Sequence, residues 1–231
     1  MNLAVFLQVT MADSLKAAQD AGSLKMSYWE LTLKGGWVMV PIFLLSLIAV
    51  YIFIERYFAI RKASEVDTNF MNRIRDYIHD GKVDNALTLC QSYTNPVSRM
   101  IEKGVQRIGR PLQDISTSIE NVGKLEVYKL EKGLPTLATV AGAAPMLGFL
   151  GTVLGMIRAF YDISNAGNNI NVSLLSKGMY MALVTTVAGL IVGLIAYFAY
   201  NYLVANVEKV VNKLEATSTE FMDLLNEPVT K

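Results

Sequence analysis

Two long stretches without a charged residue, at 133–157 and 178–207, constrain this chain most. A membrane-spanning helix needs about 20 mostly apolar residues, and both stretches exceed that length. Each carries small and hydroxyl-bearing residues three or four positions apart, a spacing that lets helix backbones approach closely in lipid. These stripes are Ala141, Pro145, Gly148, Thr152, Gly155 and Ala159, and Ala182, Thr185 or Thr186, Gly189, Gly193 and Ala196. We expect both stripes to be contact faces offered to another molecule.

The composition also indicates a membrane protein. Of 231 residues, 52% are hydrophobic and 18% are charged, and the net charge is +1. This balance gives no reason to expect nucleic acid as a partner. A third apolar stretch, at 37–54, is short for a span but is flanked by apolar and aromatic residues. We therefore predict an all-α membrane protein with three transmembrane helices.

The three uncharged stretches, at 37–54, 133–157 and 178–207, contain no Asp, Glu, His or Cys, so they hold no group for acid-base, nucleophilic or metal chemistry. Cys90 and His79 each occur once in the chain, which excludes an internal disulfide and a histidine cluster. We interpret both as ordinary residues outside the membrane. The sequence predicts a protein that is not an enzyme and binds no metal or cofactor.

Basic residues set the predicted orientation. Arg56, Arg61 and Lys62 follow the first stretch, and Lys129 and Lys132 precede the second. Cytoplasmic flanks are rich in Lys and Arg, which places residues 61–132 inside and the amino terminus outside. We expect the amino end to stay on the protein, because residues 1–11 lack a basic region of the signal-peptide type.

The predicted order of segments follows from these assignments. It is an extracytoplasmic segment with an amphipathic helix (1–34), a first transmembrane helix (35–60), a cytoplasmic helical domain (61–132), a second transmembrane helix (133–162), a short periplasmic loop (163–176), a third transmembrane helix (177–207) and a cytoplasmic C-terminal helix (208–231). Inside the cytoplasmic domain we expect helices at 67–78, 83–93 and 96–108, and a long one from 111 into the second span. We interpret the mixed charges of this domain as a solvated face.

An apolar stripe continues after the third span. Its members are Val207, Val210, Val211, Leu214, Phe221 and Leu225. The third helix is therefore expected to run to about residue 226. One narrow chain is not expected to cover this stripe alone, so the pattern favours an oligomer.

Two runs in the spans resemble a known family. Residues 143–156, AAPMLGFLGTVLGM, and 178–193, GMYMALVTTVAGLIVG, are similar to the signature of the MotA/TolQ/ExbB proton-channel family. Further likeness lies in WEL at 29–31, KGG at 34–36 and IER at 54–56, which resemble the start and end of the first span in the ExbB branch. From about residue 28 onward nearly the whole chain shares the resemblance.

The resemblance implies an assembly. It implies a pentameric ring of three-span subunits with long cytoplasmic helical extensions, in the bacterial inner membrane, with the amino terminus periplasmic and the carboxyl terminus cytoplasmic. It also implies a dimer of an ExbD- or TolR-like single-span protein inside the ring, whose membrane helix carries an essential aspartate. A TonB-like protein is the further partner expected.

Thr152 and Thr186 are the candidate site. Thr152 lies six residues before Arg158, and Thr186 lies nine after Lys177, which gives depths of roughly 9 and 13 Å from the same side. The two hydroxyls can therefore share a layer, and the resemblance implies that they line the proton pathway. The residues alone leave a second interpretation open, in which each threonine only bonds the carbonyl four positions earlier in its own helix.

Other positions in the motifs concern packing. Pro145 leaves a carbonyl without its helical donor and is expected to kink its helix. The resemblance implies a kink that opens a cytoplasmic vestibule, and simple packing shape is the alternative. The glycines assigned to close packing are Gly148, Gly151, Gly155, Gly189 and Gly193. The chain departs from the family at Met181, where many members carry a glutamate.

Our hypothesis from the sequence is a proton-channel and scaffold subunit of an inner-membrane motor. The motor would use the proton motive force, through the partner's aspartate, to energise outer-membrane transport. With Met181 in place of the glutamate, proton transfer would rest on that aspartate alone, or the chain has a different ion path or client. The alternatives are a TolQ-like subunit of an envelope, secretion or gliding motor, and a structural scaffold that does not conduct.

Overall fold

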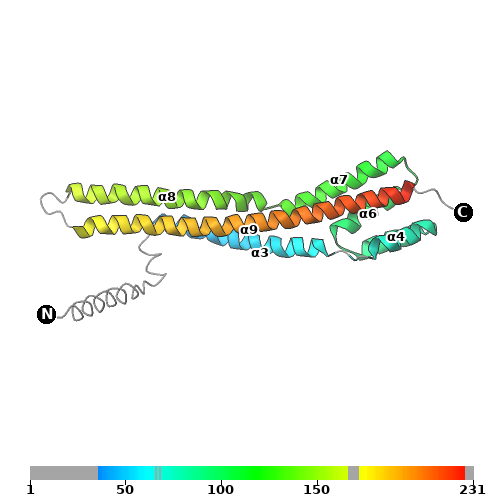
Figure 1. Ribbon diagram of the computed structural model, residues 1–231, viewed down its shortest axis with the longest axis horizontal. Helices are drawn as coiled ribbons and strands as arrows, with labels where there is room; N and C mark the ends of the chain where they lie inside the picture. Colours follow the sequence, from blue (N-terminus) through cyan, green and yellow to red (C-terminus); the bar gives the residue numbers. More distant parts are fainter. Residues whose placement is uncertain (1–35, 66, 68, 166–171, 227–231) are drawn as a thin grey trace, which may run out of the picture. The chain divides into compact units, whose positions relative to one another are not determined.

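The structure is a computed structural model, and it describes residues 36–65, 67, 69–165 and 172–226. All the regular secondary structure in these residues is helical, which confirms the predicted all-α class. The helices are α3 (Met39–Ser64), α4 (Phe70–His79), α5 (Val83–Ser92), α6 (Pro96–Val105), α7 (Leu112–Glu131), α8 (Leu134–Asn165) and α9 (Val172–Asn226) (Figure 1). The amphipathic helix predicted within 1–34 and the centre of the predicted loop at 163–176 lie outside the described residues.

Three described helices are long and apolar enough to cross a membrane, as the sequence predicts. They are Met39–Ser64, Leu112–Asn165 and Leu175–Asn226, where the second range joins α7 and α8. At about 1.5 Å per residue, the 26 residues of α3 give roughly 39 Å, longer than the roughly 30 Å of a hydrocarbon core. Because α9 has 55 residues and ends at Asn226, the predicted continuation of the third helix is also confirmed.

The helix predicted from residue 111 into the second span is wrong, because the chain breaks there into α7 and α8. Lys132 leaves helical geometry with ψ 124°, and Gly133 takes φ +89°. A positive φ of this kind favours glycine, which has no Cβ to clash with the backbone. Smaller differences occur at other ends: α4 begins at Phe70 rather than 67, and α6 ends at Val105 rather than 108.

The described residues form two compact units. The smaller unit comprises 36–41, 147–165 and 172–188, and it contains the second half of α8 and the first part of α9. The larger unit comprises 42–65, 67, 69–146 and 189–226. It contains most of α3, the helices α4 to α7, the first part of α8 and the remainder of α9.

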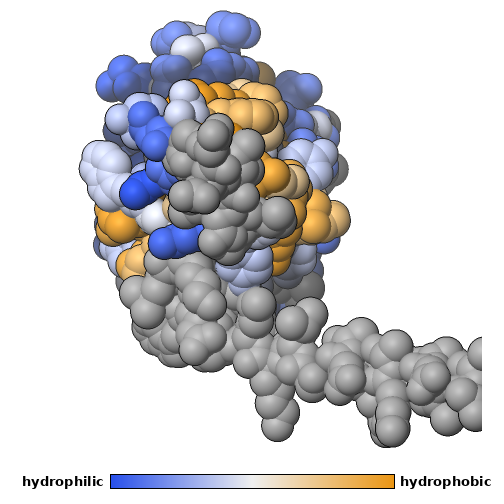
Figure 2. All heavy atoms as spheres, turned by 90° about the vertical axis from the view of Figure 1, so that its left-hand side faces the viewer, coloured by the Kyte–Doolittle hydropathy of each residue, from blue (hydrophilic) through white to orange (hydrophobic). Residues whose placement is uncertain are grey.

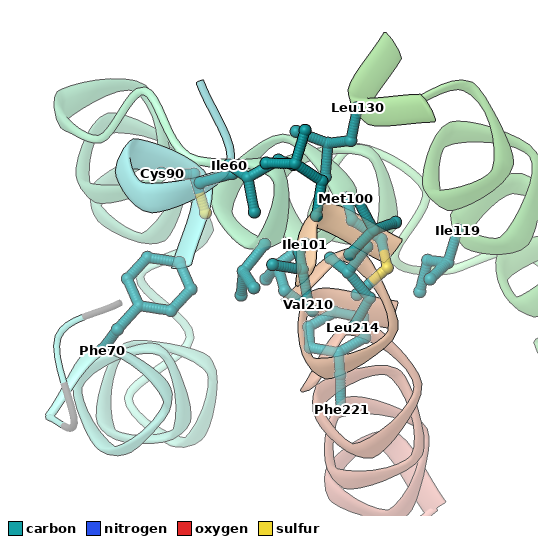
Figure 3. Packing of buried hydrophobic residues seen from close by; sticks show 14 of the residues in the cluster. Ile60, Phe70, Cys90, Met100, Ile101, Ile119, Leu130, Val210, Leu214 and Phe221 are labelled. Carbon is teal, nitrogen blue, oxygen red and sulfur yellow. The ribbon is translucent and has the colours of Figure 1, made fainter. Parts of the chain in front are cut away.

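The hydrophobic core of the larger unit gathers side chains from α3 to α9 (Figure 3). The end of α9 contributes Val210, Leu214 and Phe221, which are 2%, 3% and 0% exposed. A Cβ on Gly104 would lie 2.6 Å from the Phe221 ring, so the ring packs directly on the backbone of α6. The expectation that a neighbouring molecule must cover the apolar stripe of α9 is therefore wrong for these residues, because the chain covers them itself.

Large apolar side chains remain exposed on the candidate spans. In α3 they include Phe43, Leu47 and Tyr51, which are 57%, 52% and 71% exposed. Hydrophobic residues also lie uncovered on the face seen in Figure 2. Exposed apolar surface on long uncharged helices suits lipid or partner helices rather than water.

Candidate functional site

In the smaller unit α8 and α9 run side by side and pack through small residues (Figure 1). A Cβ on Gly155 would lie 2.9 Å from the Ala182 Cβ and 2.9 Å from the Gly178 carbonyl oxygen. A Cβ on Gly178 would lie 2.6 Å from the Ala159 Cβ. Real Cβ atoms do not approach so closely, so these glycines are what allows the two backbones to touch.

The two small-residue stripes therefore meet inside the chain. A Cβ on Gly148 would lie 3.0 Å from the Thr185 carbonyl oxygen, and Gly151 faces the Thr185 side chain. Thr185 is 0% exposed, and its hydroxyl donates to the Ala182 carbonyl at 2.8 Å. The expectation that these stripes are offered to another molecule is wrong at these positions, because the partner of each helix is the other helix of the same chain.

Thr152 and Thr186 are brought together, as their matching depths predict. Their hydroxyl oxygens are in hydrogen-bond contact across the two helices, and both side chains are half-buried. Each hydroxyl also reaches the carbonyl four residues earlier in its own helix: Thr152 to Gly148 at 3.3 Å, and Thr186 to Ala182 at 3.2 Å. The two hydroxyls therefore share a layer and also bond their own helices, so the interpretation in which each threonine bonds only its own helix is wrong.

The bonds around this threonine pair limit what it can offer to a ligand. Each hydroxyl has one proton to donate and two lone pairs that accept. Thr186 can donate to the Gly148 carbonyl at 3.1 Å, and Thr152 can donate to Thr186. This arrangement uses both protons within the protein and leaves lone pairs unused. The pair is therefore better suited to accept a hydrogen bond, from water or from a protonated acid, than to donate one to a carboxylate.

Pro145 packs against Gly193 in the larger unit. A Cβ on Gly193 would lie 2.5 Å from the Pro145 Cγ and 3.0 Å from the Ala141 carbonyl oxygen. That carbonyl is the one that loses its helical donor to Pro145. A Cβ at position 193 would crowd both the proline ring and this carbonyl, and glycine leaves that space free. This geometry favours the packing role of Pro145, and Gly189 is likewise buried in α9.

Met181, at the position of the absent glutamate, contacts the chain before α3. A Cβ on Gly36 would lie 2.8 Å from the Met181 sulfur, and Gly36 has φ +70°. Glycine is therefore favoured at position 36 for two reasons, its backbone conformation and the space it leaves. The side chain of Met181 fills this gap as flexible apolar side chains do.

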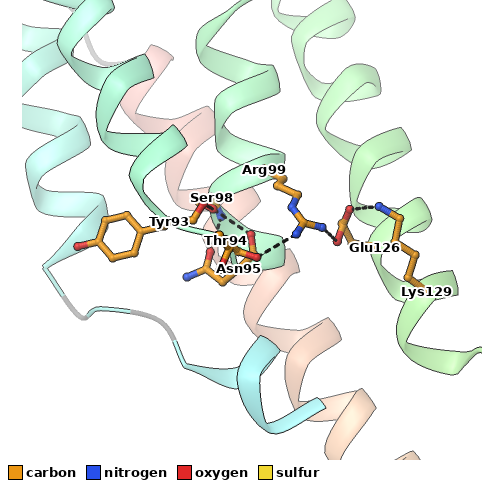
Figure 4. A network of polar contacts seen from close by, with 7 residues as sticks. All are labelled: Tyr93, Thr94, Asn95, Ser98, Arg99, Glu126 and Lys129. Atoms are coloured by element: carbon orange, nitrogen blue, oxygen red, sulfur yellow. Dashed lines mark hydrogen bonds and ion pairs between the residues drawn. The ribbon is translucent and has the colours of Figure 1, made fainter. Parts of the chain in front are cut away.

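An ionic network surrounds the buried carboxylate of Glu126 in the larger unit, and we do not predict it from the sequence (Figure 4). Glu126 is 5% exposed and accepts from Arg99 at 2.8 Å and from Lys129 at 2.6 Å. The interpretation of all these charges as a solvated face is wrong for Glu126. The signal was present, because Glu126 falls on the buried face of α7 with Ile119 and Leu130.

Cys90 is an inert core residue. It is 1% exposed, and burial raises the pKa of its thiol to about 12. A thiol with such a pKa carries almost no thiolate at neutral pH, and thiolate is the reactive form. The structure agrees with the interpretation of Cys90 as an ordinary residue.

These features describe a helical membrane protein with three candidate spans, in which a threonine pair joins the uncharged stretches of two helices. Residues 92–216 match the MotA/TolQ/ExbB proton channel family, a match over more than half of the chain. The chain therefore belongs to the MotA/TolQ/ExbB proton channel family.

Relatives named ExbB and TolQ are similar to this chain. A putative ExbB homologue of Methanothermobacter thermautotrophicus is 31% identical over 177 residues, which cover 75% of this chain and 62% of that protein. Less than two thirds of that relative's length is thus matched here. ExbB of Aquifex aeolicus is 40% identical over 115 residues, covering 49% of this chain and 77% of the relative. TolQ of Haemophilus influenzae is 36% identical over 98 residues, which cover 42% of this chain and 41% of that protein.

Proposed function

We propose that this chain is the proton-channel and scaffold subunit of an inner-membrane motor that uses the proton motive force. The observation that carries the proposal is the Thr152–Thr186 pair, which joins the uncharged stretches of α8 and α9 within the family match. Polar groups in such helices are costly unless they serve packing or a pathway. One elementary charge crossing the membrane releases about 2.3 kcal/mol per 100 mV, which is the energy available to the motor.

The proton carrier is a carboxyl group on a partner, an ExbD- or TolR-like single-span protein present as a dimer. This chain has no Asp, Glu, His or Cys in residues 133–157 and 178–207, so it cannot bind the proton itself. The unused lone pairs of the threonine pair accept from the protonated carboxyl, and they do not bind its carboxylate form. Protonation therefore favours the partner near the pair, and loss of the proton releases it.

The remaining features of the assembly belong to the same proposal. Five copies surround the partner in the bacterial inner membrane, with residues 61–132 and the carboxyl terminus in the cytoplasm and the amino terminus in the periplasm. The basic residues at both ends of 61–132 support this orientation. Force on a TonB-like protein then energises transport through the outer membrane, the kind of role that the relatives' name, biopolymer transport protein, suggests.

The test is conduction by vesicles that contain this chain and its single-span partner. Thr152→Val with Thr186→Val keeps the side-chain volume and removes both hydroxyls, so the ring should assemble and proton flux should fall at least tenfold. Thr139→Val is the matched control, because Thr139 is exposed and bonds only the Pro135 carbonyl in its own helix. Normal flux in the double variant, measured with a pH dye under an imposed potential, would exclude the pathway.

A scaffold without conduction is the second candidate, and Met181 favours it. Where many relatives carry an ionisable residue, this chain places a side chain packed on Gly36. Vesicles of the complete complex that hold a proton gradient indefinitely would support the scaffold. A leak that disappears when the partner's aspartate is changed to asparagine would support the motor. A TolQ-like role, suggested by the 36% identity to TolQ of Haemophilus influenzae, would show as capture of a TolR-like rather than an ExbD-like partner.

A further inference from the structure

We propose that the larger unit holds a binding site for a phosphate ester, supplied by the headgroup of an anionic membrane lipid. The site is a pocket of about 300 Å³ between the end of α3, the start of α6 and the end of α7. Its charged lining consists of Arg56, Lys62, Arg99, Lys129 and Glu126. Nothing in the proposed motor function requires this pocket.

The lining carries more positive than negative charge. Four of its residues are cations and one is an anion. Glu126 already binds both Arg99 and Lys129, and Arg56 is paired with Glu55 beside the pocket, so four cations face two carboxylates. Among the described residues, Lys62 forms no ion pair and is exposed. Cations held close together repel one another, so a further anion in the pocket lowers their energy.

Several donors remain available for that anion. A lysine ammonium has three protons and an arginine guanidinium has five. Lys129 donates one hydrogen bond to Glu126. Arg99 donates one to Glu126 and one to the Thr94 carbonyl (Figure 4). Both side chains are substantially exposed, 61% for Lys129 and 46% for Arg99, so the remaining N–H groups can reach a ligand from outside. Arginine and lysine together are the usual ligands of phosphate.

The position of the pocket along the spans points to a lipid. Arg56 lies two residues after the end of the apolar run at 37–54, and Lys129 lies five residues before the first residue of α8. Arg56 donates to the Lys129 carbonyl at 2.8 Å, which ties the two helix ends at one level. Next to Arg56, Tyr57 stacks on Tyr202 of α9, with ring centroids 6.3 Å apart. Tyrosines gather at the headgroup level of membranes, the level at which lipid phosphates lie.

Apolar surface for the acyl chains is available on the same helix. Tyr51, Ile54 and Phe58 of α3 are 71%, 50% and 63% exposed, just before and beside the level of Arg56. Basic pockets between spanning helices at the cytoplasmic side are a known way in which proteins bind anionic headgroups. A free phosphate offers the same oxygen atoms without the chains, so the experiment must separate the two sources.

The experiment is native mass spectrometry of the full chain in neutral detergent, with phosphatidylglycerol or phosphatidylcholine added. The expected result is retention of phosphatidylglycerol and little retention of phosphatidylcholine. Lys62→Gln with Lys129→Gln should weaken phosphatidylglycerol binding on the order of 30-fold, since each lysine near a membrane surface contributes about fivefold. Lys62→Gln alone should weaken phosphatidylglycerol binding about fivefold. This variant leaves every bond of Glu126 in place.

Two controls keep the test specific. Lys124→Gln with Lys213→Gln removes the same charge from exposed positions outside the pocket and should change nothing. Lys62→Arg with Lys129→Arg keeps the charge and should retain the lipid. Glycerol 3-phosphate that binds the wild type at millimolar concentration, with no lipid retained, would support the site with a free phosphate ester as its ligand. Equal retention of both lipids, or equal loss in the control pair, would overturn the proposal.

Discussion

The hydroxyl oxygens of Thr152 and Thr186 meet across the contact of α8 and α9, and the Gly148 carbonyl lies within reach of both. Such a cluster can form only because Gly148 leaves room: a Cβ there would lie 3.1 Å from the Cα of Thr186. The glycine at position 148 thus determines how closely the two hydroxyls approach each other.

A disulfide should form between the two threonine positions when both are cysteine. Thr152→Cys with Thr186→Cys places the sulfur atoms where the hydroxyls now touch, so a mild oxidant should link them nearly completely within the chain. The measurement is the fraction of free thiol by mass spectrometry. Thr152→Cys with Val187→Cys is the control, because Val187 is 55% exposed and lies on another side of α9. Equal linking in both pairs would contradict the described register.

Gly104→Ala should destabilise the protein. The new Cβ would lie 2.6 Å from the Phe221 ring and 2.8 Å from the Ile119 side chain, both of which are fully buried. Overpacking of this kind costs about 1 to 3 kcal/mol. The measurement is the free energy of unfolding in detergent. Gly142→Ala is the control, because nothing lies within 4 Å of its Cβ and alanine favours a helix, so that variant should be unchanged or more stable.

The Asp67 carboxyl should make stability fall at low pH. The Asn69 backbone N–H and the Tyr93 hydroxyl, each at 2.9 Å, bond the carboxylate and lower the pKa of Asp67. A folded-state pKa below the unfolded one gives stability that is present above the unfolded pKa, near 3.9, and is lost as pH falls through the folded pKa. Asp67→Asn should therefore flatten the dependence of unfolding free energy on pH below about 4.

The matched variant for that experiment is Tyr93→Phe. It removes the second of the two bonds and leaves the larger one, from Asn69, so its pH dependence should lie between wild type and Asp67→Asn. A steeper dependence in Asp67→Asn than in wild type would contradict the assignment.

Cys90 should resist thiol reagents in the folded protein. Its thiol is 1% exposed and its pKa is raised to about 12, so alkylation at neutral pH requires unfolding of the larger unit. Labelling by a maleimide, followed by mass spectrometry, should proceed at the rate of unfolding and accelerate in Gly104→Ala but not in Gly142→Ala. Rapid labelling of the wild type would show that the core around α5 opens readily.

The sequence pattern could identify the spans and the threonine layer because both depend on local spacing. Uncharged length predicts a spanning helix, and the rise of 1.5 Å per residue relates the depths of Thr152 and Thr186. The spacing of the small residues could not identify the surface against which each stripe packs. The glycines require a close neighbour, and the neighbour is the other helix of the same chain rather than a second molecule.

Two further misses have physical causes that lie in single residues. The helix that the sequence predicts from residue 111 runs through Gly133, whose positive φ ends one helix and allows the next to begin. The solvated face predicted for the charged residues includes Glu126, although its spacing from Ile119 and Leu130 places it on the buried face of α7. In both cases the pattern of the neighbouring residues predicts one structure, and a single residue, Gly133 or Glu126, determines another.

Because the glycines of α8 and α9 face each other, the outer surfaces of the smaller unit are left to bulky side chains. On α8, Phe149, Leu154 and Ile157 are 68%, 45% and 60% exposed. A foreign helix resting on such a surface stays near the wide end of the usual 8–10 Å range of axial separation. An apolar contact of this kind resists the sliding and turning of a partner helix far less than closely packed backbones would.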